Sequence, residues 1–150
     1  MRISVALGTL ALVACVGAYA ADSGMPVYVA GTADDAVGER LVYAVKETIR
    51  KSGGLSLQAS TQDAFLAVNM VTLDPDDNGS RTVYSFVLTS ADSDESHFDY
   101  ELSFVGVCGT DRVVQCAERI VASVDSVSER YKKSVADALR NQPTKQDAVN

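Results

Sequence analysis

Three segments in the middle of the chain alternate apolar with polar residues, and this alternation limits the fold more than any other feature. The segments cover residues 64–73, 82–89 and 97–107. Alternation with a period of two is typical of strands in a half-buried sheet. The polar connections between them include Asn78-Gly79, a hairpin signal, so the three strands are expected to pair antiparallel. One face should pack on a core, with Leu66, Val68, Met70, Tyr84, Phe86, Leu88, Phe98, Tyr100, Leu102 and Phe104.

Two segments with helical spacing flank these strands. The first covers residues 34–52, with Thr32 as its expected N-cap and Gly53-Gly54 as its end. The second runs from Thr110 or Asp111, either of which could cap it, to residue 140. Its apolar residues recur three and four apart, and we interpret this stripe, which extends through Val135 and Leu139, as core packing rather than a coiled-coil interface.

Short apolar runs at residues 27–30 and 55–58 add two strands, so the expected order is β-α-β-β-β-β-α. This order predicts an α+β fold: a two-layer sandwich with a largely antiparallel sheet and two helices on one face. The length suits a single domain over residues 21–140. The polar residues 141–150 are expected to form a disordered tail.

The first 20 residues have the composition of a bacterial export signal. Arg2 is followed by an apolar run and by Ala18-Tyr19-Ala20, which fits a cleavage site. A second interpretation stays open, because Leu12 to Cys15 resembles a lipobox, in which Cys15 would be lipidated. Either interpretation places the protein in the periplasm, free or as a lipoprotein of the outer membrane. The rest of the chain has no apolar run long enough to predict a transmembrane span.

Charge disfavours some classes of partner. The chain has 13 basic and 20 acidic residues, and removing residues 1–20 takes away only Arg2, which leaves a formal net charge of −8. Phosphate backbones repel an acidic protein without a basic stripe, so nucleic-acid binding is not expected. The same argument disfavours adsorption of the whole protein to anionic membranes.

Cys108 and Cys116 are the cysteines that remain after either processing route. An even pair in an oxidising compartment predicts a disulfide, with two buried thiols as the alternative.

No arrangement of residues indicates catalysis or a cofactor. His97 is the only histidine, which is too few for a zinc site with the two remaining cysteines. Asp74 to Gly79 matches the start of a calcium loop, but Ser85 stands where such a loop needs glutamate. Weak calcium binding and a solvated hairpin turn both remain open for this segment. We expect that the protein is not an enzyme, that it binds no cofactor and that it has no catalytic residue.

On the sheet face away from the helices, the alternation predicts several aliphatic side chains among the polar ones. Contiguous exposed aliphatic residues mark docking surfaces, although an ordinary half-polar face is the alternative. The candidate docking residues are Phe65, Val71, Val83, Val87, Val105 and Val107.

The layout resembles that of small α/β accessory lipoproteins of the bacterial envelope. Examples are the plug-like lipoprotein of lipopolysaccharide assembly and the N-terminal domain of the Tol system's propeller protein. The resemblance covers residues 26–140 and rests on the signal, the strand and helix from Val27 to Ser52, the Gly53–Leu57 exit and the strand Ala64 to Leu73. It is one of topology, and it transfers no functional residue.

The resemblance implies a non-enzymatic adaptor that binds another envelope protein. The alternative is an immunity or inhibitor protein directed against an envelope-targeted toxin or hydrolase. Small size, export and acidity fit both, and the sequence identifies neither the partner nor the oligomeric state.

Overall fold

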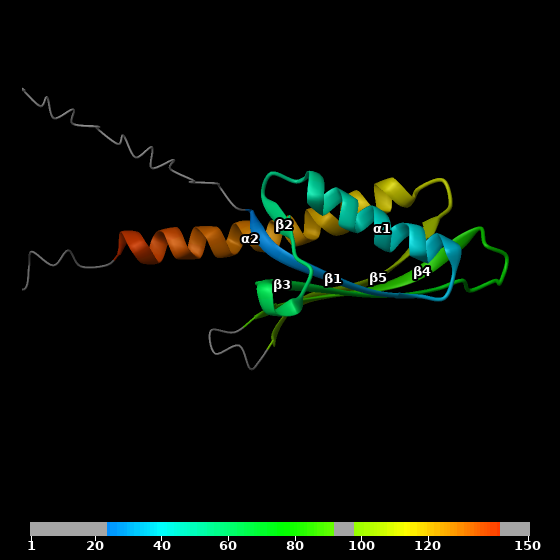
Figure 1. Ribbon diagram of the computed structural model, residues 1–150, viewed down its shortest axis with the longest axis horizontal. Helices are drawn as coiled ribbons and strands as arrows, with labels where there is room; N and C mark the ends of the chain where they lie inside the picture. The colour runs from blue at the N-terminus through cyan, green and yellow to red at the C-terminus, as the bar shows by residue number, and fades with distance from the viewer. Residues whose placement is uncertain (1–23, 92–97, 142–150) are drawn as a thin grey trace, which may run out of the picture.

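The alternating and helical patterns become five strands and two long helices. This computed structural model describes residues 24–91 and 98–141, and Figure 1 shows both helices on one side of the sheet. The expected signal at residues 1–20, Cys15, His97 and residues 142–150 of the expected tail lie outside the described residues. The elements are β1 (Met25–Ala33), α1 (Ala36–Lys51), β2 (Leu55–Leu57), the 3₁₀ helix η1 (Thr61–Asp63), β3 (Leu66–Leu73), β4 (Arg81–Ala91), β5 (Phe98–Gly109) and α2 (Val113–Arg140).

The strands form one sheet in the order β2-β1-β3-β4-β5. β1 is parallel to both of its neighbours, whereas β3, β4 and β5 form the antiparallel meander that the hairpin signals predict. The predicted α+β sandwich and its element order are therefore confirmed. The short β2 pairs with β1 in parallel because α1 connects them and returns the chain to the end of the sheet where β1 began.

The core lies between the sheet and the helices. Leu66, Val68, Met70, Tyr84, Phe86 and Leu88 are all buried, as their alternation predicts. The helices contribute Val37, Leu41, Val45 and Ile49 from α1 and Ala117, Ile120, Val124 and Val127 from α2.

Asp35, not Thr32, caps α1. The Asp35 carboxylate accepts a hydrogen bond from the Gly38 backbone N–H at 2.8 Å. Thr32 could not take this role because it still belongs to β1, where it pairs with Val71. The Asp35 carboxylate also accepts a hydrogen bond from the Thr82 hydroxyl at 2.7 Å, which fixes the start of α1 to the sheet.

α2 contains 28 residues, about 42 Å at 1.5 Å per residue. Its N-cap is Arg112, which makes no side-chain capping bond, so neither Thr110 nor Asp111 caps it. Thr110 instead donates its hydroxyl to the Ser80 carbonyl at 2.8 Å and so holds the β3–β4 turn. Figure 1 shows the C-terminal part of α2 extending past the end of the sheet. Within residues 24–91 and 98–141, no helix is apolar and long enough to cross a bilayer.

Candidate functional site

The side of the sheet that faces away from the helices carries a cluster of aliphatic side chains. Strand register places Val83 between Leu73 and Val107, and places Ser85 between Val71 and Val105. The exposed fractions are 56% for Val71, 57% for Leu73, 71% for Val105 and 59% for Val107. We call Val71, Leu73, Val83, Val105 and Val107 the aliphatic patch.

The register brings together most of the residues that the sequence nominates for docking. Val87 lies on the same face, between Asn69 and Ser103, so polar neighbours separate it from the aliphatic patch. Leu73 was not nominated, although it follows Val71 by two residues and so continues the same alternation. The predicted strand at residues 64–73 already ends at Leu73, so its alternation is the signal that could have identified this residue.

Phe65 does not belong to this face. It precedes β3, and its ring lies edge-on against the ring of Tyr131 on α2, with centroids 4.8 Å apart. The expectation that Phe65 points away from the helices is therefore wrong. Alternation fails here because Phe65 lies outside the regular strand, where η1 has just turned the chain.

A β-bulge changes the facing of β5. Leu102 pairs with Leu88, but Tyr100 pairs with Thr89, so Glu101 is an extra residue without a partner of its own. The predicted core positions Phe98 and Tyr100 are consequently exposed, by 51% and 66%, and this expectation is wrong. A bulge interrupts the period of two on which the expectation rested.

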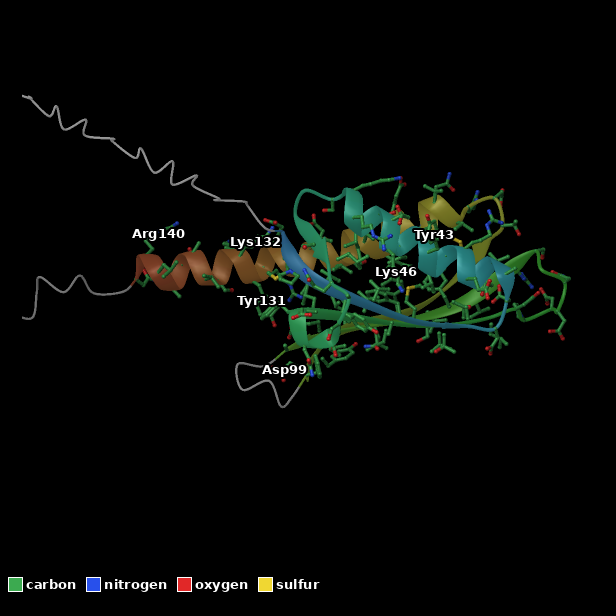
Figure 2. The ribbon with its side chains drawn as sticks, in the orientation of Figure 1. Tyr43, Lys46, Asp99, Tyr131, Lys132 and Arg140 are labelled. Carbon is green, nitrogen blue, oxygen red and sulfur yellow. A yellow bond between two sulfur atoms is a disulfide. The ribbon has the colours of Figure 1, made fainter. Side chains whose placement is uncertain are left out.

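The extra residue, Glu101, joins the sheet to α2. Its carboxylate accepts hydrogen bonds from the hydroxyls of Ser90, at 2.8 Å, and Tyr131. Arg130 approaches the same carboxylate at 3.4 Å. Burial, and secondarily the hydrogen bond to Glu101, raises the pKa of Tyr131. Figure 2 shows Tyr131 between α2 and the strand layer.

Two depressions flank Tyr131. One is polar and is lined by Glu101, Arg130, Lys133 and Ser134. The other is an apolar groove of about 460 Å³ along the projecting part of α2, with Lys132 at its edge. We call this second depression the Tyr131 groove; its apolar lining is Met25, Phe65, Tyr131, Val135, Ala136 and Leu139.

The end of α2 that lines the Tyr131 groove is more exposed than its sequence pattern predicts. Ser128 is the last fully buried residue of the helix, and Val135 and Leu139 beyond it are 58% and 63% exposed. The sequence pattern predicts core packing along the whole stripe, and this expectation is wrong beyond Ser128. The stripe leaves the core because α2 is longer than the sheet beneath it, and strand lengths cannot be read from the helix.

The acidic segment from Asp74 to Gly79 forms a self-bonded turn. The Asp74 carboxylate accepts hydrogen bonds from the backbone N–H groups of Asp76 at 3.0 Å and Gly79 at 2.6 Å. These bonds lower the pKa of Asp74. Asp76 in turn pairs with Arg81 at 2.6 Å. Among the residues that the structure describes, no three His, Cys, Asp or Glu side chains are grouped to hold a metal ion.

Cys108 and Cys116 form the disulfide that the sequence predicts, with Cα atoms 6.2 Å apart. It links the end of β5 to the first turns of α2. Cys108 is fully buried, so the bond belongs to the core rather than to an exposed redox site.

Comparisons with known proteins bear only on the fold. No family model matches the chain, and no curated protein matches it. A hypothetical protein from Chlamydia trachomatis superimposes with a TM-score of 0.51 at 9% identity, over 71% of this chain and 98% of that one.

Two further solved structures are more distant. PelC from Paraburkholderia phytofirmans superimposes with a TM-score of 0.47 at 11% identity, over 67% of this chain and 86% of that one. Rare lipoprotein B from Shewanella oneidensis gives a TM-score of 0.37 at 13% identity, over 70% of this chain and 98% of that one. Of these three structures, the Chlamydia trachomatis protein alone has a TM-score above 0.5, and at 9% identity it supports the fold and no function.

Proposed function

We propose that the protein is a non-enzymatic accessory protein of the bacterial envelope that binds another envelope protein through the aliphatic patch. The observation that carries this proposal is the exposure, each by more than half, of Val71 and Leu73 on β3 and of Val105 and Val107 on β5, the two strands that flank β4. The location rests on the export signal expected from residues 1–20.

Burial of this face against a partner would be favourable. Removing apolar surface from water stabilises a complex by about 25 cal/mol per Å² before the costs of association. Ser85 lies between Val71 and Val105, and Asn69 and Ser103 border the aliphatic patch on the side of Val87, which is the mixed composition of a non-obligate interface. A partner that covers this face would therefore present an apolar centre with hydrogen-bonding groups around it.

The test is a cross-linked pull-down of the tagged full-length protein from its native envelope. Val105→Asp and Val71→Asp should each remove the partner, because a charge at the centre of an apolar interface is buried without a pair. Val114→Asp is the matched control: Val114 is also an exposed valine, at 64%, but it lies on α2.

All three variants should unfold at the same urea concentration as the parent protein within experimental error. The proposal is wrong if Val105→Asp retains the partner at its original stoichiometry. Identification of the partner decides between the two expected roles, since an assembly component supports an adaptor and a toxin or hydrolase supports an inhibitor.

A further inference from the structure

The projecting end of α2 is an amphipathic helix without a covering layer among the described residues. Tyr131, Val135 and Leu139 follow one another at four-residue intervals and therefore form a single stripe. Tyr131 is half-buried against Phe65, whereas Val135 and Leu139 are 58% and 63% exposed. The stripe leaves the sheet and continues into the apolar side of the Tyr131 groove.

The same segment is the basic end of an acidic chain. Residues 129–140 carry four of the 13 basic residues and two of the 20 acidic ones. Arg130 and Lys132 precede and follow Tyr131, so they border the apolar stripe on its two sides. The side chains of Arg130 and Arg140 are 64% and 76% exposed, and Figure 2 shows Lys132 and Arg140 along the projecting helix.

We propose that this end of α2 lies on the surface of a bilayer that contains anionic phospholipids, with Val135 and Leu139 at the boundary between head groups and acyl chains. An apolar stripe with lysine and arginine at its borders is the pattern of helices that lie in the plane of a membrane surface. Long basic side chains can extend from such a stripe to reach phosphate groups.

Acidic side chains also lie at this end: Glu101, Glu129 and Asp137 pair with Arg130, Lys132 and Arg140, and Asp99 on β5 lies close enough to Tyr131 to raise its pKa. The remaining negative charge of the chain acts weakly on the contact. The Debye length is about 8 Å at physiological ionic strength, so only charges close to the surface interact strongly with it. The acidic turn at residues 74–80 lies beyond the opposite end of β3 from Phe65, which lines the Tyr131 groove. Eight strand residues, about 26 Å at 3.3 Å per residue, separate those two ends.

The start of β1 favours the same orientation. Met25 lines the Tyr131 groove, so the chain enters the sheet beside the projecting end of α2. If Cys15 is lipidated, Met25 is ten positions further along the chain, a span of at most about 36 Å when fully extended. A lipid at that position would hold this end of the molecule, rather than the β3–β4 turn, close to the membrane.

Single-tryptophan fluorescence tests the proposal, because the chain contains no tryptophan of its own. Val135→Trp in the full-length protein is mixed with vesicles of phosphatidylethanolamine and phosphatidylglycerol. We expect its emission to shift to shorter wavelength and to be quenched by brominated phospholipids. Val105→Trp is the matched control, since Val105 is also exposed but lies in the aliphatic patch, and its emission should not change.

Charge is tested on the same background. Lys133→Gln combined with Arg140→Gln should lower the partition coefficient of Val135→Trp by about 30-fold, since each basic residue near an anionic surface favours binding. Lys46→Gln combined with Lys51→Gln changes the net charge equally but on α1, and should have little effect. Vesicles of phosphatidylcholine alone should reproduce the weaker binding.

Three results would overturn the proposal. One is an unchanged Val135→Trp spectrum in the anionic vesicles, and another is an equal shift at Val105→Trp. The third is a shift that grows with protein concentration without vesicles, which would mean that a second copy covers the stripe. The first and third results do not involve the aliphatic patch, so this proposal and the proposed function can fail separately.

Discussion

At the scale of single residues, Gly38 marks the closest approach between α1 and the sheet. A Cβ atom at this position would lie 1.8 Å from the Thr72 hydroxyl oxygen. Thr72 is 1% exposed and within 3.3 Å of the Asp35 carboxylate, so it has little room to move. A glycine is therefore required here for space rather than for backbone conformation.

Gly38→Ala should lower the free energy of unfolding by about 2–3 kcal/mol, because it overpacks a filled site. Gly53→Ala is the matched control, since an added Cβ there meets nothing within 4 Å. Urea denaturation at neutral pH measures both. Equal effects at the two positions would contradict the account of close approach.

Ser128 is the clearest polar defect in the described core. Its hydroxyl is fully buried and has no hydrogen-bond partner there. An unpaired buried hydroxyl costs about 1–3 kcal/mol relative to water.

Ser128→Ala should therefore leave the free energy of unfolding unchanged or raise it by about 1 kcal/mol. Ser123→Ala on the same helix is the control, since Ser123 is partly exposed and donates its hydroxyl to the Arg119 carbonyl. Thermal and urea unfolding compare the two. A loss above about 1 kcal/mol for Ser128→Ala would show that the hydroxyl has a stabilising partner.

At the scale of elements, the disulfide and the bulge both act on β5. The bulge turns Glu101 toward Ser90 and Tyr131, and the disulfide ties the far end of the strand to α2. β5 is thus attached to the second helix near both of its ends. This matters because β5 is an edge strand, with β4 as its one neighbouring strand in the sheet.

Reduction of the disulfide should destabilise the protein by about 2–3 kcal/mol, the chain-entropy value for a short ring. The two cysteines are eight positions apart in the sequence. Urea denaturation with and without a phosphine reductant measures this difference without changing a side chain. Cys116→Ala should give a similar loss and should make the protein insensitive to the reductant.

At the scale of the whole molecule, pH tests how the sheet and α2 hold together. Burial raises the pKa of Tyr84, which lies in the core, and burial and Glu101 raise the pKa of Tyr131. In the unfolded chain, tyrosine ionises near pH 10. In the folded state the two hydroxyls stay protonated to a higher pH than in the unfolded chain. The stabilisation present below about pH 10 is therefore lost as the pH rises through the folded-state pKa values.

The free energy of unfolding should accordingly fall as the pH is raised from 9 to 11. Tyr131→Phe should reduce the slope of this fall, with the contribution of Tyr84 remaining. Urea midpoints at half-unit pH intervals give the slope. If the free energy of unfolding does not change between pH 9 and 11, neither tyrosine has a higher pKa in the folded state than in the unfolded state.

Much of the architecture was predictable from the sequence because local patterns carry it. The alternation in β3 and β4 identified the buried side chains correctly, and the Asn78-Gly79 pair located the first hairpin. The two helical stripes gave the number of helices and their common side of the sheet. Most nominated docking residues share one face for the same reason, since a strand's period of two is fixed by its backbone.

The candidate sites depended on features that only the folded chain decides. The bulge at Glu101 reversed the expected facing of Phe98 and Tyr100, because one extra residue shifts every side chain beyond it to the other face. The Tyr131 groove exists because α2 extends beyond the end of the sheet and because Phe65 points toward the helix. The sequence by itself determined the elements and the buried faces of β3, β4 and α1, since these follow from contacts between near neighbours. Tertiary packing decided the positions of the elements relative to each other. Both surfaces proposed for binding depend on those relative positions.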